Sequence, residues 1–571
     1  MKCMKFLAVA LFSVGLSIAA TSVSAGDENN RLRAQMLAAT DARDDENPVF
    51  EHAVKAGNFE ALAMLGQIGG EACQTLLPYL RSENSEARRW AAKGAEFCQD
   101  DSLSPHLLAQ FELELPANNG PLARALGFSG KADTRAVLAR LLNKSSGAVT
   151  GATLFGLLQS VAYAPTNAAD IEGLDVSALL NIAATAHKPQ AVQGDGAYAA
   201  AYLLARLQNV PDLLPYDVYA PVLRKFLTSA SRLEGTQLET ARLMTRLARE
   251  YGTEAIPDLR AAAEVSQLVV RHEAIRSMGR LSDAASKSYL LGLANGEGEA
   301  ASRHLAVAAL GQRSAADTAL VPVLEQFVSD DNRWVATTAL RWLGQRDAVA
   351  ANEIAADWLG GEGYYLAFQA LIALTGSEEG KAILKTYADT HPDTVRGYEA
   401  AVALDPSIEA VTKPRKTPSM ALLASYKSRE LVLETTRGIL CITMTGDAPY
   451  AATSFLQLAD VGKMDGMLWH RVIPNFVSQA GQIENKEIAR WGSIREEWGG
   501  EHRIGTVGVA TAGRDTGTTQ FFINTSYNMH LNGRYTVFGK VAKGMDVVYA
   551  LEEGDVITKA YTVKAGNRQC E

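Results

Sequence analysis

Two segments near the C-terminal end of the chain combine a cation, aromatic rings and side-chain amides at close spacing. Residues 469–481 have the sequence WHRVIPNFVSQAG, and residues 505–523 have the sequence GTVGVATAGRDTGTTQFFI. An arginine beside aromatic rings can stabilise a transition state by hydrogen bonding alone, because its guanidinium stays charged and presents its donors in a fixed plane. This chemistry needs no covalent intermediate, metal or nucleotide, so we expect no cofactor and no metal.

Other catalytic patterns are missing from the sequence. The nine histidines are scattered, and there is no H-E-x-x-H, G-x-S-x-G or G-x-x-x-x-G-K-[ST] motif. Hydrolase, zinc and P-loop chemistry are therefore not predicted.

The 64 acidic residues outnumber the 55 basic ones and give a net charge of −9, which opposes binding to nucleic acid.

The two segments resemble the motifs of the cyclophilins, the peptidyl-prolyl cis-trans isomerases built on a closed eight-stranded β-barrel. The family pattern F-H-R-x-I-P-x-F-x-x-Q-G-G is matched at His470, Arg471, Ile473, Pro474, Phe476, Gln479 and Gly481. The pattern A-x-A-G-x-x-T-x-x-S-Q-F-F-I is matched at Ala510, Ala512, Gly513, Thr516, Gln520, Phe521, Phe522 and Ile523. The resemblance covers roughly residues 429 to 565 and implies the barrel fold and the isomerase activity.

The resemblance also implies a role for individual residues. The catalytic group consists of Arg471, Gln479 and Phe476. The implied substrate-binding residues are Val477, Ala510, Thr511, Gln520, Phe522, His530, Leu531 and Tyr535, with the backbone groups of Ala510 and Thr511 holding the substrate chain. His470 belongs to the same motif, but we expect it to pack behind its strand, because neighbouring residues of a strand face opposite sides.

These residue types suit the isomerisation of a prolyl bond. Rotation about a peptide bond faces a barrier of about 18 to 20 kcal/mol, because the nitrogen lone pair is delocalised into the carbonyl. In the twisted transition state that lone pair is localised on nitrogen, where a guanidinium N–H can donate to it. An apolar notch anchors the proline ring while the preceding carbonyl swings. Arg471 is therefore predicted to bind the transition state more tightly than the planar ground state.

Several positions depart from the family pattern. Ala480 replaces the first glycine of Q-G-G, Gln482 replaces the usual acidic residue, and Thr518 and Thr519 replace Gly-Ser. Backbone angles near the two glutamines could differ as a result. His530 stands where cyclosporin-sensitive members have tryptophan, so we predict weak inhibition by that drug.

Short β-rich runs surround the motifs and must position them. Strands are predicted at residues 431–433, 439–442, 469–473, 507–510, 521–524, 535–541 and 557–563, with a helix that opens at Pro449. Many short strands with one or two helices favour a closed barrel.

The preceding region, from about residue 45 to 400, has a helical texture. It is rich in Ala and Leu with apolar residues at helical spacing. Three related blocks end at Gly279, Gly311 and Gly344, which are 32 and 33 residues apart. This period predicts one helix pair per repeat, in which glycine ends the second helix in a left-handed cap. The pattern resembles HEAT-like repeats, whose extended face usually holds proteins. A spacer without a client groove is the alternative.

The first 25 residues have the features of a secretory signal. Lys2 and Lys5 precede an apolar run at residues 6–20, and small residues follow at 23–25. An uncleaved membrane anchor is the alternative, but a run of 15 residues is shorter than the roughly 20 needed to span a bilayer. We therefore expect export, cleavage, a periplasmic location and no stable membrane span.

Four cysteines lie beyond this leader, and none forms a C-x-x-C motif. An oxidising compartment permits disulfides. Cys73 with Cys98 and Cys441 with Cys570 would each keep a bridge within one predicted domain. Four free buried thiols are the alternative.

The sequence thus predicts a multidomain α + β protein. Its parts are a signal peptide (1–25), an α-solenoid of HEAT-like hairpins (26–404), an extended and solvated linker (405–428) and a cyclophilin-like domain (429–571). The leading hypothesis is an exported isomerase that assists folding, whose array binds or positions proline-containing clients. The alternative is a weakly active or inactive prolyl-binding scaffold or holding chaperone.

Overall fold

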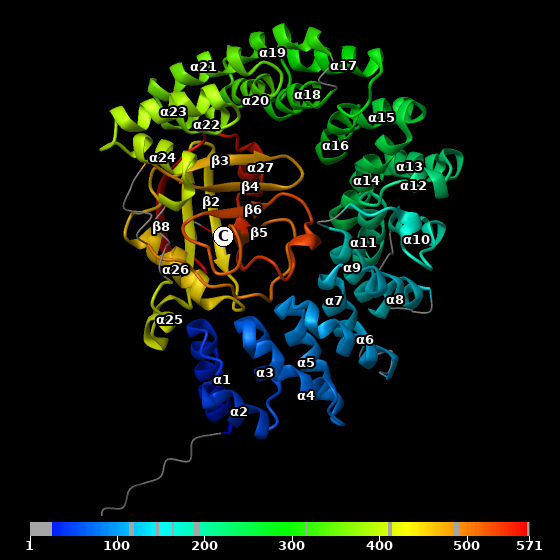
Figure 1. The fold of residues 1–571 in the computed structure, drawn as a ribbon, viewed down its shortest axis with the longest axis vertical. Coiled ribbons are helices and arrows are strands. Elements are labelled where there is room, and N and C mark those ends of the chain that lie inside the picture. Colours follow the sequence, from blue (N-terminus) through cyan, green and yellow to red (C-terminus); the bar gives the residue numbers. More distant parts are fainter. Residues whose placement is uncertain are drawn as a thin grey trace, which may run out of the picture.

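An arc of helices surrounds a strongly curled β-sheet in the computed structural model (Figure 1). The structure describes residues 25–113, 119–143, 148–162, 165–187, 194–313, 317–408, 414–484, 491–567 and 570. The arc starts below the sheet in Figure 1, passes around its right side and ends above it on the left. Two further helices, α25 (Met420–Tyr426) and α26 (Pro449–Asp460), lie between the two ends of the arc.

The first half of the arc consists of α1 (Ala25–Ala42), α2 (Pro48–Lys55), α3 (Glu60–Ile68), α4 (Leu77–Leu80), α5 (Ser85–Cys98), α6 (Ser104–Leu113), α7 (Asn119–Ser129), α8 (Ala132–Leu142), α9 (Ala148–Val161), α10 (Val176–Ala184), α11 (Gly194–Leu204), α12 (Val210–Leu213) and α13 (Tyr216–Ser229). The second half consists of α14 (Gly235–Ala248), α15 (Ile256–Ala263), α16 (Leu268–Met278), α17 (Ala284–Asn295), α18 (Ala300–Gln312), α19 (Val321–Val328), α20 (Arg333–Gly344), α21 (Ala348–Gly360), α22 (Tyr364–Leu374), α23 (Glu378–Thr390) and α24 (Val395–Leu404). We call α1 to α24 the helical array.

The repeated glycines of the array lie at helix contacts and not in left-handed caps. Gly279 has a φ of −62°, and Gly311 lies inside α18. A Cβ added at Gly279 would lie 2.7 Å from the Cα of Ala309, and one at Gly311 would lie 2.1 Å from the ring of Trp342. The predicted caps are therefore wrong. Gly279 and Gly311 lack a side chain because neighbouring helices approach closely there, whereas a Cβ added at Gly344 would lie at an ordinary contact distance of 3.6 Å from that of Ala351.

The C-terminal region forms one eight-stranded antiparallel sheet in the order β3-β4-β6-β5-β7-β2-β1-β8. Its strands are β1 (Arg429–Thr435), β2 (Gly438–Met444), β3 (Leu468–Ile473), β4 (Val477–Gln482), β5 (Thr506–Val509), β6 (Phe521–Asn524), β7 (Val537–Lys543) and β8 (Ile557–Lys564). It also contains α25 (Met420–Tyr426), α26 (Pro449–Asp460), the short η11 (Met529–Leu531) and α27 (Met545–Ala550). The sheet curls until β3 meets the residues before β8, where Trp469 N–H donates to the Asp555 carbonyl at 2.8 Å.

The predicted strands are present, and the sequence missed β4. Residues 477–482 contain Ser, Gln and Gly, which weaken the alternating apolar pattern that marks a strand. The helix predicted to open at Pro449 is present as α26.

The two hydrophobic cores interlock. Trp334 of α20 is buried in the core of the sheet, whereas Tyr527 and Met529, which follow β6, are buried in the core of the array. Trp498 forms a smaller cluster with Ala63 and Phe97 of the array. Each region therefore buries apolar side chains of the other, which favours a fixed placement of the sheet inside the arc.

The segment between α24 and β1 packs on the sheet domain instead of being fully solvated. Residues 420–426 form α25, and Pro414 forms a bridge with Ser493. Arg415 is half-buried, donates to Ser454 and Gln457, and lies 5.1 Å from the ring of Trp491. The predicted solvated linker is thus corrected, because a cation that finds an aromatic face and two acceptors gains from leaving water.

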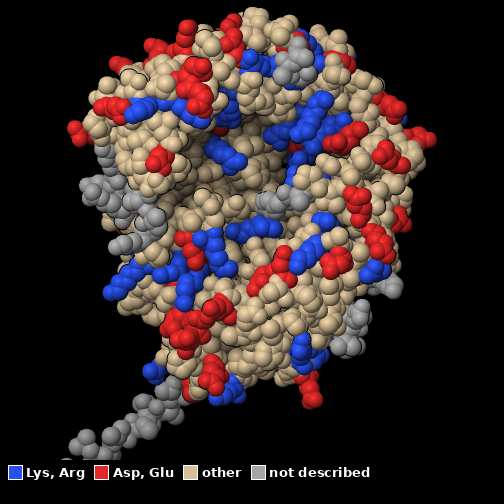
Figure 2. Space-filling view, in the orientation of Figure 1, with Lys and Arg blue, Asp and Glu red and all other residues tan. Residues whose placement is uncertain are grey.

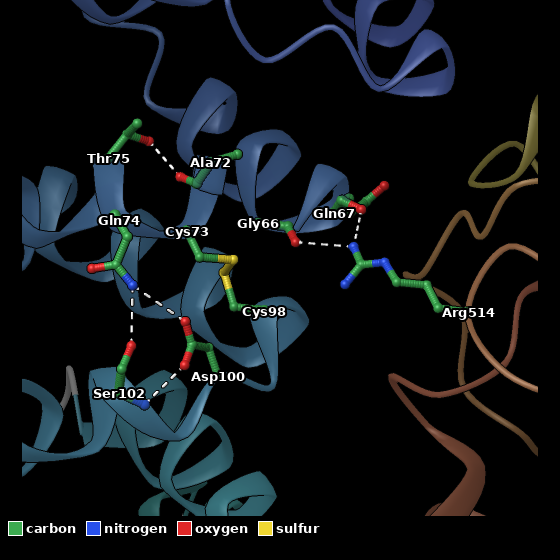
Figure 3. Close-up of a disulfide and its surroundings, with 10 residues drawn as sticks. All are labelled: Gly66, Gln67, Ala72, Cys73, Gln74, Thr75, Cys98, Asp100, Ser102 and Arg514. Carbon is green, nitrogen blue, oxygen red and sulfur yellow. Dashed lines mark hydrogen bonds between the residues drawn. A yellow bond between two sulfur atoms is a disulfide. The ribbon is translucent and has the colours of Figure 1, made fainter. Parts of the chain in front are cut away.

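Both expected disulfides are formed. Cys73 is bonded to Cys98 in the array (Figure 3), and Cys441 is bonded to Cys570 in the sheet domain. Figure 3 also shows Arg514 of the sheet domain reaching the end of α3, where it donates to the carbonyls of Gly66 and Gln67.

The predicted signal peptide lies almost entirely outside the described residues, which begin at Ala25. Among the helices that are described, none has the length and apolarity required to cross a bilayer.

Candidate active site

The β3–β4 hairpin and β6 bring the two sequence motifs together. Arg471 is paired with Gln479 across the hairpin, and Gln479 is paired with Phe522 of β6. The register shifts between Trp469 and Arg471, so strict alternation fails there. His470 is buried as predicted, but it meets Phe368 of the array edge-on at 5.9 Å. The helical array therefore provides the surface that covers this histidine.

A polar wall carries the predicted catalytic cation. Arg471 Nη1 donates to Gln479 Oε1 at 3.1 Å, and Gln479 Nε2 donates to Gln520 Oε1 at 3.0 Å. The guanidinium lies 5.7 Å from the ring of Phe476. Burial lowers the pKa of Arg471 and nearby Glu553 opposes this shift, but a guanidinium remains charged in any aqueous buffer. Arg471 is thus a fixed donor at the edge of an aromatic surface.

An apolar notch lies next to this wall. Val477, Phe522 and Leu531 form its buried floor, and Phe476, Ala510 and Tyr535 pack against them. Tyr535 meets Phe522 edge-on at 5.9 Å. The structure thus gathers most of the predicted substrate-binding side chains into one apolar cluster, whose surface is suited to an apolar ring.

Comparison with known proteins identifies this arrangement. The model of the cyclophilin type peptidyl-prolyl cis-trans isomerase family matches residues 431–566. Peptidyl-prolyl cis-trans isomerase B of Bacillus subtilis is 42% identical over 114 residues, which are 19% of this chain and 80% of that protein. The chain belongs to the cyclophilin family. A peptidyl-prolyl cis-trans isomerase of Helicobacter pylori is 36% identical over 151 residues, covering 25% of this chain and 93% of that protein. A crystal structure of a Cryptosporidium parvum cyclophilin is 23% identical and covers 24% of this chain and 98% of its own, with a TM-score of 0.23.

In the cyclophilin domain, the geometry explains isomerisation without a covalent step. A proline ring seated against Phe476, Phe522 and Leu531 is held while the carbonyl before it rotates. Arg471 is the donor placed at the edge of this notch, where the lone pair of the prolyl nitrogen becomes available during the twist. Gln479 holds the guanidinium in place, and no step requires a metal. Among the described residues, no three His, Cys, Asp or Glu side chains are grouped so as to hold one.

Two predicted binding residues of the cyclophilin domain have other contacts. The N–H of Ala510 donates to the carbonyl of Gln520 at 3.0 Å, so it is already used. His530 is stacked between Phe476, with ring centroids 5.7 Å apart, and Tyr202 of α11, at 5.4 Å. Burial, followed by the positive charge of Arg206, lowers the pKa of His530 to about 3. The prediction of a substrate contact through the His530 ring is therefore corrected, because the array covers its open face.

Other residues that support the pocket were missed. His502 stacks on Phe522 at 5.6 Å and is held by Asn524, whose Nδ2 lies 3.2 Å from His502 Nδ1. Burial lowers the pKa of His502 to about 4, so this ring stays neutral near pH 7. It lies between β4 and β5 in a segment without a periodic pattern, and nothing local in the sequence indicates it.

The array also reaches the rim of the cyclophilin pocket. Arg276 of α16 donates to the carbonyl of Pro474 at 2.8 Å, and Gln369 of α22 donates to the carbonyl of His470 at 3.4 Å. Figure 2 shows a hollow between the sheet domain and the arc, with Lys and Arg side chains gathered around it. Access to the pocket is therefore bounded by the array.

Proposed function

We propose that this peptidyl-prolyl isomerase is exported to the periplasm, where it assists protein folding, and that a HEAT-like helical array holds or positions its clients. The isomerase chemistry follows from the family and from the pocket around Arg471. The observation that supports a role for the array in client binding is that the rim of the pocket is formed partly by the array, through Arg276, Gln369 and Tyr202. A polypeptide that reaches Arg471 must pass along these helices.

Export is supported by the leader and by the two disulfides. Disulfides form and persist mainly in oxidising compartments. Mass spectrometry of the purified mature protein and fractionation of the cells test this part. We expect a new N-terminus near residue 26 and a periplasmic location. An intact leader in the soluble fraction of the cytoplasm would contradict it.

The client role is tested by crosslinking in the full-length protein. A photoreactive amino acid replaces Arg341 on α20, beside Arg471, and in a matched variant it replaces exposed Lys225 on the outer helix α13. With an unfolded, proline-containing client, we expect crosslinks from position 341 and few from position 225. Equal yields at the two positions would remove the client-holding role.

A prolyl-binding scaffold with little turnover is the second candidate, and the replacement of a motif glycine by Ala480 favours it. In the structure, however, Ala480 is fully buried opposite Phe521 of β6, and Gly481, at a register shift between β3 and β4, keeps the positive φ of 116°. The departure therefore leaves the hairpin intact. In a prolyl-peptide assay of the full-length protein, we expect Arg471→Ala to lower kcat/KM by about 100- to 1,000-fold. Equal wild-type and variant rates, both at the uncatalysed level, would favour the scaffold.

A further inference from the structure

We propose that Tyr364 and Glu399 of the helical array are positioning residues for Arg471, acting through a relay of three glutamine amides. The array then takes part in the reaction by orienting the catalytic cation. Neither residue contacts the pocket, and neither belongs to the cyclophilin motifs.

The relay is continuous from the pocket to the array. After the bonds from Arg471 to Gln479 and from Gln479 to Gln520, Gln520 Nε2 donates to Gln482 Oε1 at 3.2 Å. Gln482 Nε2 donates to the Tyr364 hydroxyl at 2.8 Å and to Glu399 Oε1 at 3.1 Å. The Tyr364 hydroxyl donates to the same carboxyl oxygen.

The two ends of the relay fix the direction of every amide. A guanidinium can only donate hydrogen bonds, and an ionised carboxylate can only accept them. Each glutamine between them must therefore present its oxygen toward Arg471 and its NH₂ toward Glu399. If one amide were flipped, its NH₂ would face a donor on the side of Arg471, and its oxygen would face an acceptor on the side of Glu399. Bonds aligned in this way polarise one another, so the carboxylate strengthens the acceptor that holds Arg471.

The charge at the array end changes near neutral pH. Burial, supported by Glu484 and opposed by Tyr364, Gln482 and Arg396, raises the pKa of Glu399 to about 7. Arg396 donates to Glu484 at 3.0 Å, so these two charges largely compensate each other. The carboxylate exists above about pH 7 and is lost below it. We therefore expect kcat/KM to be higher above pH 7, because the ionised carboxylate accepts from Gln482 and Tyr364 more strongly than a neutral carboxyl group does.

The test uses three variants of the full-length protein. Tyr364→Phe removes one acceptor of the relay, and Glu399→Gln removes the charge at nearly constant shape. Tyr387→Phe is the control, since its ring stacks on His391 of the same array and its hydroxyl makes none of the hydrogen bonds of the relay. The net worth of one hydrogen bond predicts a decrease in kcat/KM of about two- to tenfold for Tyr364→Phe and Glu399→Gln, mostly in kcat. The control should match the wild type.

The pH profile separates positioning from a merely structural role. Glu496 also has a pKa raised by burial to about 7, so the wild-type profile alone does not isolate Glu399. The difference between wild type and Glu399→Gln does, and we expect the increase in kcat/KM around pH 7 to shrink in the variant. Wild-type kcat in both relay variants, or an unchanged profile in Glu399→Gln, would overturn the proposal. A loss of thermal stability without a change in the profile would also count against it.

An independent observation concerns the charges around the hollow. We infer that the hollow selects prolyl segments flanked by acidic residues, an inference that rests on the proposed client role of the array. Arg206 lies in the turn after α11, and the other three cations are Arg246 of α14, Arg341 of α20 and Arg471 of β3. In the described part of the chain none of these four arginines forms a salt bridge. The Nε of Arg246 is buried there without a hydrogen-bond partner.

These arginines lie on both sides of the proline notch. Burial lowers the pKa of Arg471, Glu553 opposes this shift, and the nearby charge of Arg341 adds to it. On the far side, Arg206 and Arg246 contribute to the low pKa of His530. Three ring contacts of less than 6 Å each separate the two sides, from Arg471 to Phe476, from Phe476 to His530 and from His530 to Tyr202. An extended peptide of about five residues, at about 3.3 Å per residue, covers such a distance.

The acidic groups near these arginines are already engaged. Glu553 accepts from the Tyr365 hydroxyl at 2.9 Å and from Val472 N–H at 3.1 Å, and Glu273 accepts from Arg242 at 3.1 Å. Positive charge is therefore in excess around the hollow, although the whole chain carries a net charge of −9. An anionic peptide would gain from this field when it enters.

The experiment compares prolyl peptides that carry Glu or Lys on both flanks of the proline. For the full-length wild type, we expect kcat/KM to be about three- to tenfold higher for the Glu peptide in low salt, and the ratio to approach one in 1 M salt. The ratio should also approach one in the double variant Arg206→Gln/Arg246→Gln and stay high in Lys225→Gln. No preference in the wild type, or an equal preference in the double variant, overturns this inference. The crosslinking at position 341 still reports separately on the client role.

Discussion

The helical array and the sheet domain bury charged side chains in opposite ways. In the array, Arg242 is 4% exposed and donates to Glu239 at 2.8 Å and to Glu273 at 3.1 Å. Burial alone would raise the pKa of Glu273, but Arg276 and Arg242 outweigh it and hold this pKa near 2. In the sheet domain, burial raises the pKa of Glu497 to about 8. At these two glutamates, charge is thus compensated by pairing in the array and removed by protonation in the sheet.

The two regions also differ in the sequence separation that their disulfides bridge. The disulfide of the array joins residues 25 positions apart, whereas that of the sheet joins residues 129 positions apart. Array helices pack mainly on helices near them in sequence, whereas neighbouring strands β1 and β8 come from opposite ends of the sheet domain. The array is thus held by local contacts and ion pairs, and the sheet by long-range closure.

The prediction with the largest expected effect concerns the different loop lengths that the two disulfides close. In the chain-entropy account, the loop lengths predict that Cys441→Ser/Cys570→Ser lowers the free energy of unfolding by about 5 kcal/mol, and Cys73→Ser/Cys98→Ser lowers it by about 3.5 kcal/mol. Chemical denaturation of both double variants measures the two losses. A larger loss for the array variant would reverse the comparison.

The second prediction concerns the paired charges of the array. Arg242→Ala leaves Glu239 and Glu273 buried without their cation, so we expect a loss of about 3 to 5 kcal/mol in unfolding free energy. Arg224→Ala is the control, because Arg224 pairs with Asp258 while its own side chain is 59% exposed. We expect a much smaller loss there. Similar losses in thermal melts of the two variants would show that burial is not the deciding factor.

The third prediction uses the carboxyl of the sheet domain. Its pKa of about 8 lies above the unfolded value of 4.5, so the folded state holds this proton more tightly. The contribution of Glu497 to stability is therefore full below about pH 4.5 and is lost as the pH rises toward 8, at no more than about 1.4 kcal/mol per pH unit. Melting temperatures between pH 5 and 8 should decline less in Glu497→Gln than in the wild type. Parallel declines would contradict the assignment.

For Glu273 the sign is opposite. Its folded pKa of about 2 lies below the unfolded value, so its contribution to stability is present above about pH 4.5 and is lost only in acid. The same melts, extended below pH 4.5, therefore distinguish the two regions.

The smallest expected effect is the inhibition by cyclosporin. Tyr202 of the array covers the ring of His530, at the position where sensitive cyclophilins present tryptophan. We expect weak inhibition of the wild type in the peptide assay, and also of His530→Trp, because the array still occupies that face. Inhibition of the wild type at nanomolar concentration would contradict this.

The pocket could be predicted from the sequence because its residues lie in two continuous motifs. The strands that pair Arg471 with Gln479 and Gln479 with Phe522 are themselves parts of these two motifs. Tyr202 on His530 and Glu399 on Gln482 could not be predicted, because each pair joins distant parts of the chain without a shared local pattern. The repeated glycines were detected by their spacing, but their role is a helix contact that only the packed structure defines.

The α1 end of the arc meets a part of the chain that is synthesised much later. Arg43, just after α1, is paired with Asp515, and Asp41 is paired with Arg495. Because domains generally fold in the order in which they are made, α1 is complete long before its partners exist. The contacts between the α1 end of the arc and the sheet domain therefore form only after the sheet domain has been made. Premature truncation of the chain would therefore leave an open arc with its inner arginines exposed to solvent.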